Sequence, residues 1–180
     1  DLSWVIPVVG QPKLQGEVAI TLQTTRPIRR ILLDYVESTV QQVTLQGQEL
    51  FYQDYQDYQH NQKDGKLVIR LPLLWPAQTP LILSVKFEGE PIPNDDVGWY
   101  SLPAKNRVPA AHFSFSEPEG TRSLFPCHDH PSDPASFNTS ITVQQPYLAV
   151  ASGILKTTAS VLVNDQPFRR FEYELPQPIP

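Results

Sequence analysis

Residues 161–175 read VLVNDQPFRRFEYEL, and this stretch decides the fold class. Phe171, Tyr173 and Leu175 alternate with charged residues, a period of two that is typical of a half-buried strand. The pair Asn164-Asp165 separates them from the apolar residues 161–163. Two strands joined by such a short polar pair predict a β-hairpin.

The same alternation recurs along the chain, at residues 18–22, 83–87 and 137–143. A second hairpin is predicted at Asp64-Gly65, ahead of residues 67–71. The chain has 19 prolines in 180 residues, which leaves little room for long helices because an interior proline breaks a helix. We therefore expect an all-β fold, an antiparallel β-sandwich formed by a single domain over residues 1–180.

Two segments do not alternate. Residues 52–59 read YQDYQDYQ, a repeat of three that predicts an irregular edge strand or an exposed loop. Four acidic residues lie between Glu88 and Asp96 and are interrupted by two prolines. This second segment is predicted to be a solvated loop.

Composition excludes several classes of protein. The formal net charge is -5 and the basic residues do not cluster, which argues against binding to nucleic acid or an anionic membrane. The single cysteine rules out a disulfide scaffold, and no apolar run is long enough for a membrane span. Because the sequence lacks methionine and ends in a proline-rich run, we expect a piece of a larger protein.

One cluster of polar residues could bind a metal ion. His128 and His130, between Cys127 and Asp133, would face the same side of an extended chain, and histidine is a good zinc ligand. Closed zinc sites usually draw ligands from two separated segments, so a loop that hydrogen-bonds its own backbone is favoured. A nucleophilic pair of Cys127 and His128 is disfavoured, since adjacent residues of a strand face opposite ways.

Motifs for catalysis are absent from the sequence. It contains no His-Glu-x-x-His zinc motif, no Gly-x-Ser-x-Gly elbow and no phosphate-binding glycine loop. We therefore expect no catalytic residue and no metal ligand in this chain. His60 and His112 are expected to be surface or packing residues, and the glycosylation pattern Asn138-Thr139-Ser140 matters only in a eukaryotic secretory protein.

Residues 112–131 read HFSFSEPEGTRSLFPCHDHP and carry the most specific signal. They resemble the N-terminal domain of M1-family (gluzincin) zinc aminopeptidases of the aminopeptidase N type. In that family a glutamate precedes an arginine and then Phe-Pro-Cys-x-Asp-x-Pro, and the Asp-His-Pro variant looks like a bacterial branch. The resemblance extends over nearly the whole chain through four shorter matches: GEVAI at 16–20, LVIRLP at 67–72, GWY at 98–100 and YELP at 173–176.

The resemblance implies a saddle-like β-sandwich packed on a catalytic domain that would follow residue 180. That domain of the same polypeptide would hold the zinc ion and remove N-terminal residues from peptides through a zinc-activated water. The expected partners are this domain and the N-terminus of a peptide substrate. The expected compartment is the cytoplasm or the cell envelope of a bacterium.

The resemblance also assigns two substrate-binding residues. Glu117 would enter the active site and bind the α-ammonium of the substrate through charge-assisted hydrogen bonds. Phe115 stands where many members have a glutamine that lines the pocket for the first side chain, and it would add an aromatic wall. From the residues alone, Glu117 could instead cap a turn before Pro118, and Phe115 could be a core residue. A strained or cis bond between Glu117 and Pro118 is a further implication.

Several other residues receive structural roles. Arg122 is expected to pair with a carboxylate such as Asp129, and packing roles are expected for Phe125, Pro126, Pro131, Trp4, Trp75 and Trp99. Two other functions are considered: a noncatalytic scaffold from an M1-like protein without zinc, and an unrelated adhesion or sugar-binding module with a tryptophan patch. Without a partner domain, the chain is expected to expose an apolar face.

Overall fold

The computed structural model describes residues 1–36, 38–55, 65–90, 97–117 and 120–179. In these ranges the chain forms thirteen strands and one short 3-10 turn, η1 (Thr121–Ser123). No helix in the described ranges is long and apolar enough to cross a membrane. The prediction of an all-β fold is confirmed.

Eight strands form a large sheet, in the order β12 (Ile154–Val163), β13 (Gln166–Ile179), β11 (Ala135–Gln144), β1 (Leu2–Ile6), β2 (Leu14–Leu22), β8 (Leu81–Gly89), β4 (Ser38–Leu45) and β5 (Gln48–Glu49). A second sheet has the order β3 (Ile28–Asp34), β7 (Lys66–Trp75) and β6 (Tyr52–Tyr55). The remaining two strands, β9 (Gly98–Leu102) and β10 (Ala111–Phe115), pair as a ribbon.

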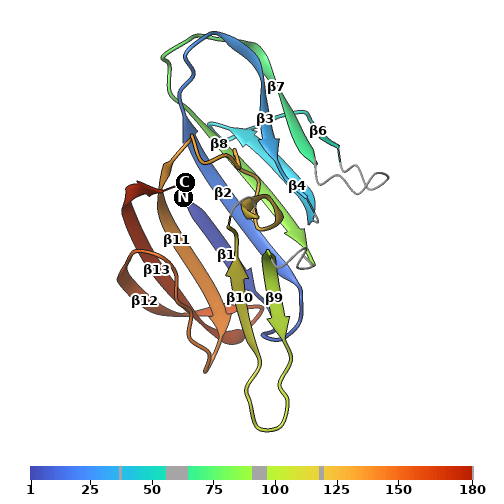
Figure 1. Cartoon of the computed structure of the whole chain (residues 1–180), viewed down its shortest axis with the longest axis vertical. Coiled ribbons are helices and arrows are strands. Elements are labelled where there is room, and N and C mark those ends of the chain that lie inside the picture. Colours follow the sequence, from blue (N-terminus) through green and yellow to red (C-terminus); the bar gives the residue numbers. More distant parts are fainter. Residues whose placement is uncertain (37, 56–64, 91–96, 118–119, 180) are drawn as a thin grey trace.

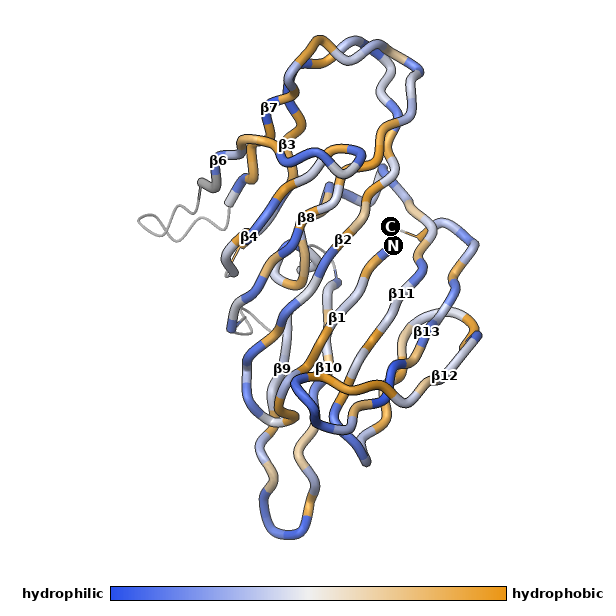
Figure 2. The backbone as a smooth tube through the Cα atoms, turned by 180° about the vertical axis from the view of Figure 1, so that it is seen from behind, coloured by the Kyte–Doolittle hydropathy of each residue, from blue (hydrophilic) through white to orange (hydrophobic). Residues whose placement is uncertain are grey.

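The ribbon and η1 lie on one face of the large sheet, and the three-stranded sheet stands at one end of it (Figure 1). Seen from behind, the opposite face of the large sheet has no further layer over it (Figure 2). The molecule therefore has a covered face, where the core lies, and an open face.

The core follows the predicted alternation. On β8, Leu83, Val85 and Phe87 are at most 2% exposed, while their neighbours point to the open face. On β7, Leu67 and Ile69 are fully buried and alternate in the same way. Alternate residues of facing strands therefore fill one interior, which is the packing expected of a sandwich.

One pair of strands departs from the antiparallel expectation. Strand β1 runs antiparallel to β2 but parallel to β11, with Leu2 opposite Thr139. All other neighbouring strands in the described ranges pair antiparallel. A parallel pair needs a long connection, and more than a hundred residues separate these two strands.

The predicted turns have different outcomes. Asn164 and Asp165 adopt φ of 50° and 61°, and Val163 pairs with Gln166 across them, so this hairpin is confirmed. Strands β6 and β7 pair antiparallel on either side of the second predicted hairpin, but Asp64 lies outside the described residues. Residues 52–55 form β6, an edge strand as predicted; residues 56–59, His60, Asp95 and Asp96 lie outside the described residues.

Gly153 precedes β12 at a position that excludes a side chain. Its φ is +102°, and a Cβ atom there would clash with the carbonyl oxygen of Glu174. We expect Gly153→Ala to lower the free energy of unfolding by about 3 kcal/mol, because backbone strain and a steric clash add. Gly47→Ala is the matched control, since Gly47 has φ +85° and no atom within 4 Å of a Cβ. Its loss should be about 1 kcal/mol in denaturant unfolding, and equal losses for both variants would contradict the clash.

Candidate functional site

The β9–β10 ribbon has an inner and an outer face. Ser114 lies opposite Trp99, and Phe113 lies opposite Tyr100. Trp99 is buried and meets Trp4 of the large sheet edge-on, with 5.7 Å between ring centroids. Phe113 and Phe115, which alternate with the inner residues, are 48% and 49% exposed. The ribbon register is regular, so the interpretation of Phe115 as a core residue is wrong.

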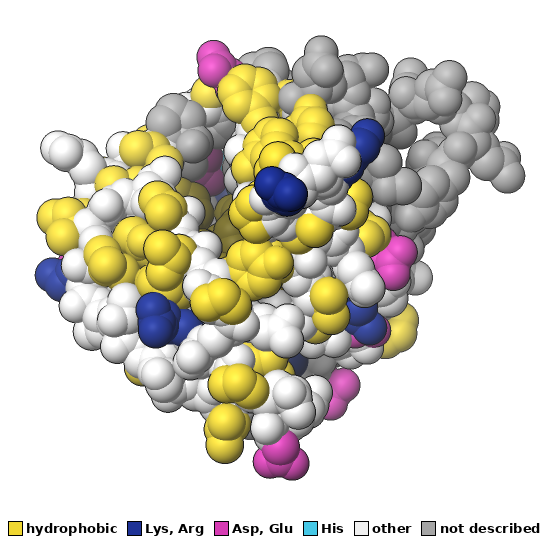
Figure 3. Space-filling view, turned by 90° about the horizontal axis from the view of Figure 1, so that it is seen from below, with side chains coloured by type: hydrophobic (Ala, Val, Ile, Leu, Met, Phe, Trp, Pro, Cys, Tyr) yellow, Lys and Arg dark blue, Asp and Glu magenta, His cyan; other side chains and the backbone are white. Residues whose placement is uncertain are grey.

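We call the outer side of the ribbon, formed by Tyr100, Leu102, Phe113 and Phe115, the ribbon face. The rings of Tyr100 and Phe113 stack in parallel, with centroids 4.5 Å apart. Leu102 is 48% exposed. Figure 3 views this end of the molecule and shows hydrophobic side chains gathered beside a hollow. An exposed apolar face is therefore present, as expected.

Glu117 follows the ribbon two residues after β10 ends. Its side chain is exposed, and within the described residues it makes no hydrogen bond or ion pair. The turn behind it is closed by the backbone, where Gly120 N–H donates to the Ser116 carbonyl over 2.7 Å. Among the described residues, no contact therefore supports the capping role for Glu117. Pro118 lies outside the described residues, and with it the geometry of the Glu117–Pro118 bond.

Behind Glu117 the chain is fixed to the body of the domain. Gly120 is buried, and a Cβ atom on it would lie 2.9 Å from Cβ of Val97. Ser123 in η1 is also buried, and its hydroxyl donates to the Gly120 carbonyl over 2.7 Å. The segment that carries Glu117 is thus held at one end by β10 and at the other by η1.

The predicted contact of Arg122 with Asp129 is confirmed. Arg122 Nε donates to Asp129 Oδ2 over 2.7 Å. The Asp129 N–H in turn donates to Asp34 Oδ2 over 3.2 Å, and the Arg122 guanidinium lies 3.9 Å from Asp34 Oδ1. Lys66 forms an ion pair with the same Asp34 carboxylate. We call Asp34, Lys66, Arg122 and Asp129 the ion cluster.

Sequence reasoning missed Asp34, although it is 6% exposed and contacts all three other residues of the ion cluster. The only signal was an acidic residue directly after the apolar residues Ile31, Leu32 and Leu33. Asp34 also exchanges backbone hydrogen bonds with Cys127, at 2.7 and 3.1 Å. Burial raises the pKa of the Cys127 thiol, and the carboxylates of Asp129 and Asp34 raise it further. Cys127 is therefore a protonated packing residue rather than a nucleophile.

The two histidines beyond Cys127 have other partners. His128 Nδ1 lies 2.8 Å from Asp133 Oδ2, and His130 Nδ1 lies 2.7 Å from the Ser132 hydroxyl. In the part of the chain that the structure describes, no group of three or more His, Cys, Asp or Glu residues could hold a metal ion. The described residues therefore do not fit zinc, and the polar loop is the interpretation that these contacts support.

Most of the packing predictions are confirmed. Phe125, Pro126 and Trp4 are buried, and Trp75 is half-buried with its Nε1–H donated to the Thr79 carbonyl. Pro131 is the exception, because it is exposed in a surface turn after His130. With Trp4 and Trp99 buried, no tryptophan patch for sugar binding is present among the described residues.

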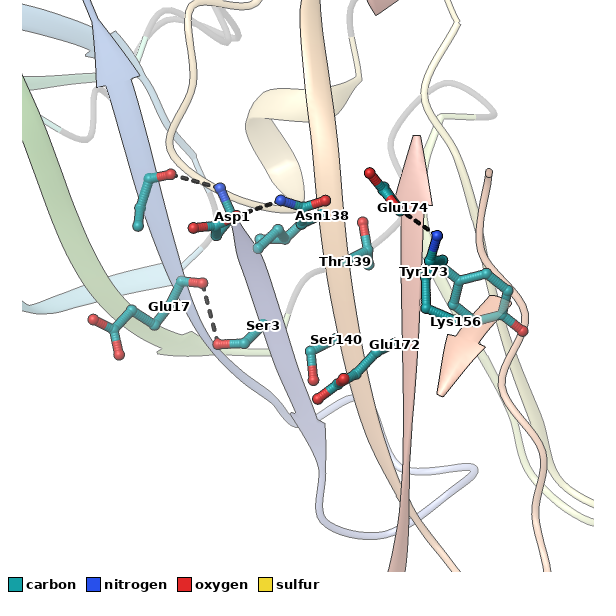
Figure 4. Close-up of a pocket in the computed structure, with 12 residues that line it drawn as sticks. Asp1, Ser3, Glu17, Asn138, Thr139, Ser140, Lys156, Glu172, Tyr173 and Glu174 are labelled. Atoms are coloured by element: carbon teal, nitrogen blue, oxygen red, sulfur yellow. Dashed lines mark hydrogen bonds and ion pairs between the residues drawn. The ribbon is translucent and has the colours of Figure 1, made fainter. Parts of the chain in front are cut away.

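A groove of about 410 Å³ lies on the open face of the large sheet (Figure 4). Ser3 lines it, whereas the next residue, Trp4, points to the ribbon side, so the groove and Glu117 lie on opposite faces. Two of its carboxylates are engaged within the sheet: Glu174 pairs with Lys156 over 2.9 Å, and Glu172 accepts from Thr157 over 2.7 Å. The groove does not contribute to the site at Glu117.

Comparisons with known proteins agree with the resemblance seen in residues 112–131. A family model described as the peptidase M1 N-terminal domain matches residues 4–178. The crystal structure of an M1 zinc metallopeptidase from Deinococcus radiodurans gives a TM-score of 0.82 at 28% identity, over 100% of this chain and 38% of that one. A mutant of that enzyme bound to a Tyr-Ser-Ala substrate gives 0.82 and 28%, over 100% and 39%.

Two further relatives are more distant or match over a shorter stretch. Leukotriene A4 hydrolase from Saccharomyces cerevisiae has a TM-score of 0.72 at 22% identity, over 100% of this chain and 26% of that one, which shows a shared fold alone. Leucine aminopeptidase 2 of Neurospora crassa is 33% identical over 78 residues, 42% of this chain and 11% of that protein. The chain therefore spans well under half the length of the relatives it matches.

His112 ties the ribbon to the loop after β1. The Gly10 N–H donates to His112 Nε2 over 2.9 Å, so the neutral ring carries its proton on Nδ1, 3.0 Å from the Ser101 hydroxyl. The ring also stacks on Trp99, with centroids 5.2 Å apart. His112 is thus the packing histidine that was predicted. Burial lowers its pKa below the ordinary 6.5, although two backbone carbonyls partly oppose this.

A lowered pKa in the folded state makes stability depend on pH. Below pH 6.5 the unfolded chain binds the proton more readily than the folded one, so the His112 contribution is complete above that value. It is lost as the pH falls through the lowered folded pKa. We expect the midpoint temperature of thermal unfolding (Tm) of the wild type to fall more than that of His112→Gln between about pH 7.5 and about pH 5. Parallel pH profiles for the two proteins would contradict the contact.

Proposed function

We propose that this chain, which belongs to the family of peptidase M1 N-terminal domains, forms one wall of the substrate site of a zinc aminopeptidase. Its role is to recognise the N-terminus of a peptide rather than to cleave it. The observation that carries the proposal is Glu117, an exposed carboxylate without a partner among the described residues, at the end of an apolar ribbon.

A carboxylate in this position suits a free α-ammonium group. Hydrogen bonds between two charged groups are roughly twice as strong as neutral ones, and they strengthen further when water is excluded. An internal peptide segment or an N-acetylated peptide has no charge to offer there. Glu117 would therefore select free N-termini, which is the property that defines an aminopeptidase.

The ribbon face supplies the apolar surroundings. Phe115 precedes Glu117 by two residues and is exposed on the ribbon face, which supports a contact with the side chain of the first substrate residue. The stacked pair of Tyr100 and Phe113 continues the same surface. An apolar surface of this kind is unfavourable in water, so we assign part of it to docking of the catalytic domain from the same polypeptide.

Zinc belongs to that catalytic domain and not to the residues described here. When bound, the zinc ion of such an enzyme activates a water molecule for attack on the first peptide bond. The residues of this chain bind and orient the substrate N-terminus and exclude water from it. The D. radiodurans relative, whose mutant is bound to a Tyr-Ser-Ala substrate, supports a peptide as the substrate class.

The test is Glu117→Gln in the whole protein. We expect kcat/KM on a peptide with a free N-terminus to fall about 100-fold, mainly through KM, because the ammonium loses its ionic partner in both ground and transition states. The preference for free over N-acetylated peptides should fall with it. Steady-state kinetics on both substrates measure the effect.

Glu49→Gln is the matched control, because Glu49 is an exposed carboxylate on β5 at the far edge of the large sheet. This variant should leave kcat and KM unchanged. If Glu117→Gln matches the wild type on both substrates, the assigned role is wrong. A whole protein without bound zinc and without aminopeptidase activity would instead favour the noncatalytic scaffold.

A further inference from the structure

We propose that Asp34 is a positioning residue for Glu117, acting through Arg122 and Asp129. The inference rests on the proposed role of Glu117 in binding the substrate ammonium. Asp34 and Glu117 are 83 positions apart in the sequence, and Asp34 lies at the end of β3, in the three-stranded sheet. It does not itself reach the substrate.

The connection runs through short polar contacts. Asp34 accepts the Asp129 N–H over 3.2 Å, and Asp129 Oδ2 accepts both the backbone N–H of Arg122, at 3.3 Å, and its Nε–H, at 2.7 Å. The Arg122 carbonyl then accepts the Val36 N–H over 3.0 Å. Arg122 is therefore fixed by its side chain and its backbone to the end of β3 and the residues that follow it.

Arg122 is the middle residue of η1, so fixing it fixes the whole turn. The buried Gly120, which leads into η1, bonds back to Ser116 over 2.7 Å. Glu117 lies inside that closed turn, and its own side chain has no contact of its own within the described ranges. Ser116, the residue before Glu117, is thereby tied to Gly120, and the ion cluster fixes η1, which directly follows Gly120.

Burial makes the ion cluster sensitive to substitution. Asp34 and Asp129 have side chains only 8% and 7% exposed, so their charges need partners in the folded state. The guanidinium of Arg122 offers several donors in one plane, which a lysine cannot reproduce. A change in the cluster should then displace η1 and Glu117 by a small distance without unfolding the sheet. A small displacement of a charged contact weakens it strongly.

The experiment is a double-mutant cycle on peptide hydrolysis by the whole protein, with Asp34→Asn, Glu117→Gln and the double variant. Asp34→Asn should raise KM about tenfold and change kcat less than about twofold, because ground-state and transition-state binding of the ammonium weaken equally. In the Glu117→Gln background, Asp34→Asn should have no further effect on KM, since the contact that it positions is already lost.

Two further variants keep the test decisive. Arg122→Lys retains the charge but loses the planar donor set, so it should show the same rise in KM and the same non-additivity with Glu117→Gln. This variant replaces Asp34→Asn in the cycle if Asp34→Asn fails to fold. Lys156→Met is the control. It removes the half-exposed, 2.9 Å ion pair between Lys156 and Glu174 at the β12 edge of the large sheet, and it should leave KM unchanged.

Independent, multiplying effects of the Asp34 and Glu117 substitutions on KM would overturn the positioning role, as would an unchanged KM in both Asp34→Asn and Arg122→Lys. If Glu117→Gln alone leaves KM unchanged, the proposed function itself has failed, whatever the Asp34 variants do. The two failures are therefore distinguishable.

Discussion

The buried carboxylate of Asp34 is the constraint on which the rest of the site depends. A carboxylate whose side chain is 8% exposed must be paired, and here two cations and a backbone N–H share that task. These partners come from β7, η1 and the loop before β11, so one side chain joins three separated segments. Removing one partner from a buried pair typically costs about 3–5 kcal/mol, which makes the arrangement of these segments strongly preferred. Because η1 is one of these segments, the proposed position of Glu117 depends on the same contacts.

Near these segments, the domain exposes an apolar surface and a charge, and both are suited to a binding partner. The ribbon face has stacked but half-exposed aromatic rings, and Glu117 next to it is a charge without a partner among the described residues. Either feature alone is common on protein surfaces. Together, at the end of one ribbon, they are the features that support the proposed recognition of a peptide N-terminus, which has an ammonium group and can have an apolar side chain. On the open face of the large sheet, by contrast, the carboxylates of Glu174 and Glu172 are engaged by Lys156 and Thr157 within the sheet.

Local sequence patterns predicted the parts of the structure that depend on local physics. The alternation on β8, the Asn164-Asp165 turn and the contact of Arg122 with Asp129 join residues that are near in sequence or follow a simple period. The parallel pairing of β1 with β11 was not predictable, because a period of two says nothing about strand direction. Asp34 was missed for a related reason: its partners lie 32 to 95 residues away and meet only when β3, β7 and η1 pack. A packing role was predicted for Pro131 because it belongs to the motif in residues 112–131, although a proline beside polar residues fits a surface turn equally well.

The most direct measurement is the crystal structure of the whole protein with a peptide analogue bound. The Glu117 carboxylate should then lie within about 3.2 Å of the ligand α-ammonium, with Phe115 against the first side chain. A ligand bound elsewhere, or one whose ammonium is held by other residues while Glu117 faces solvent, would contradict the assignment of this domain to substrate recognition.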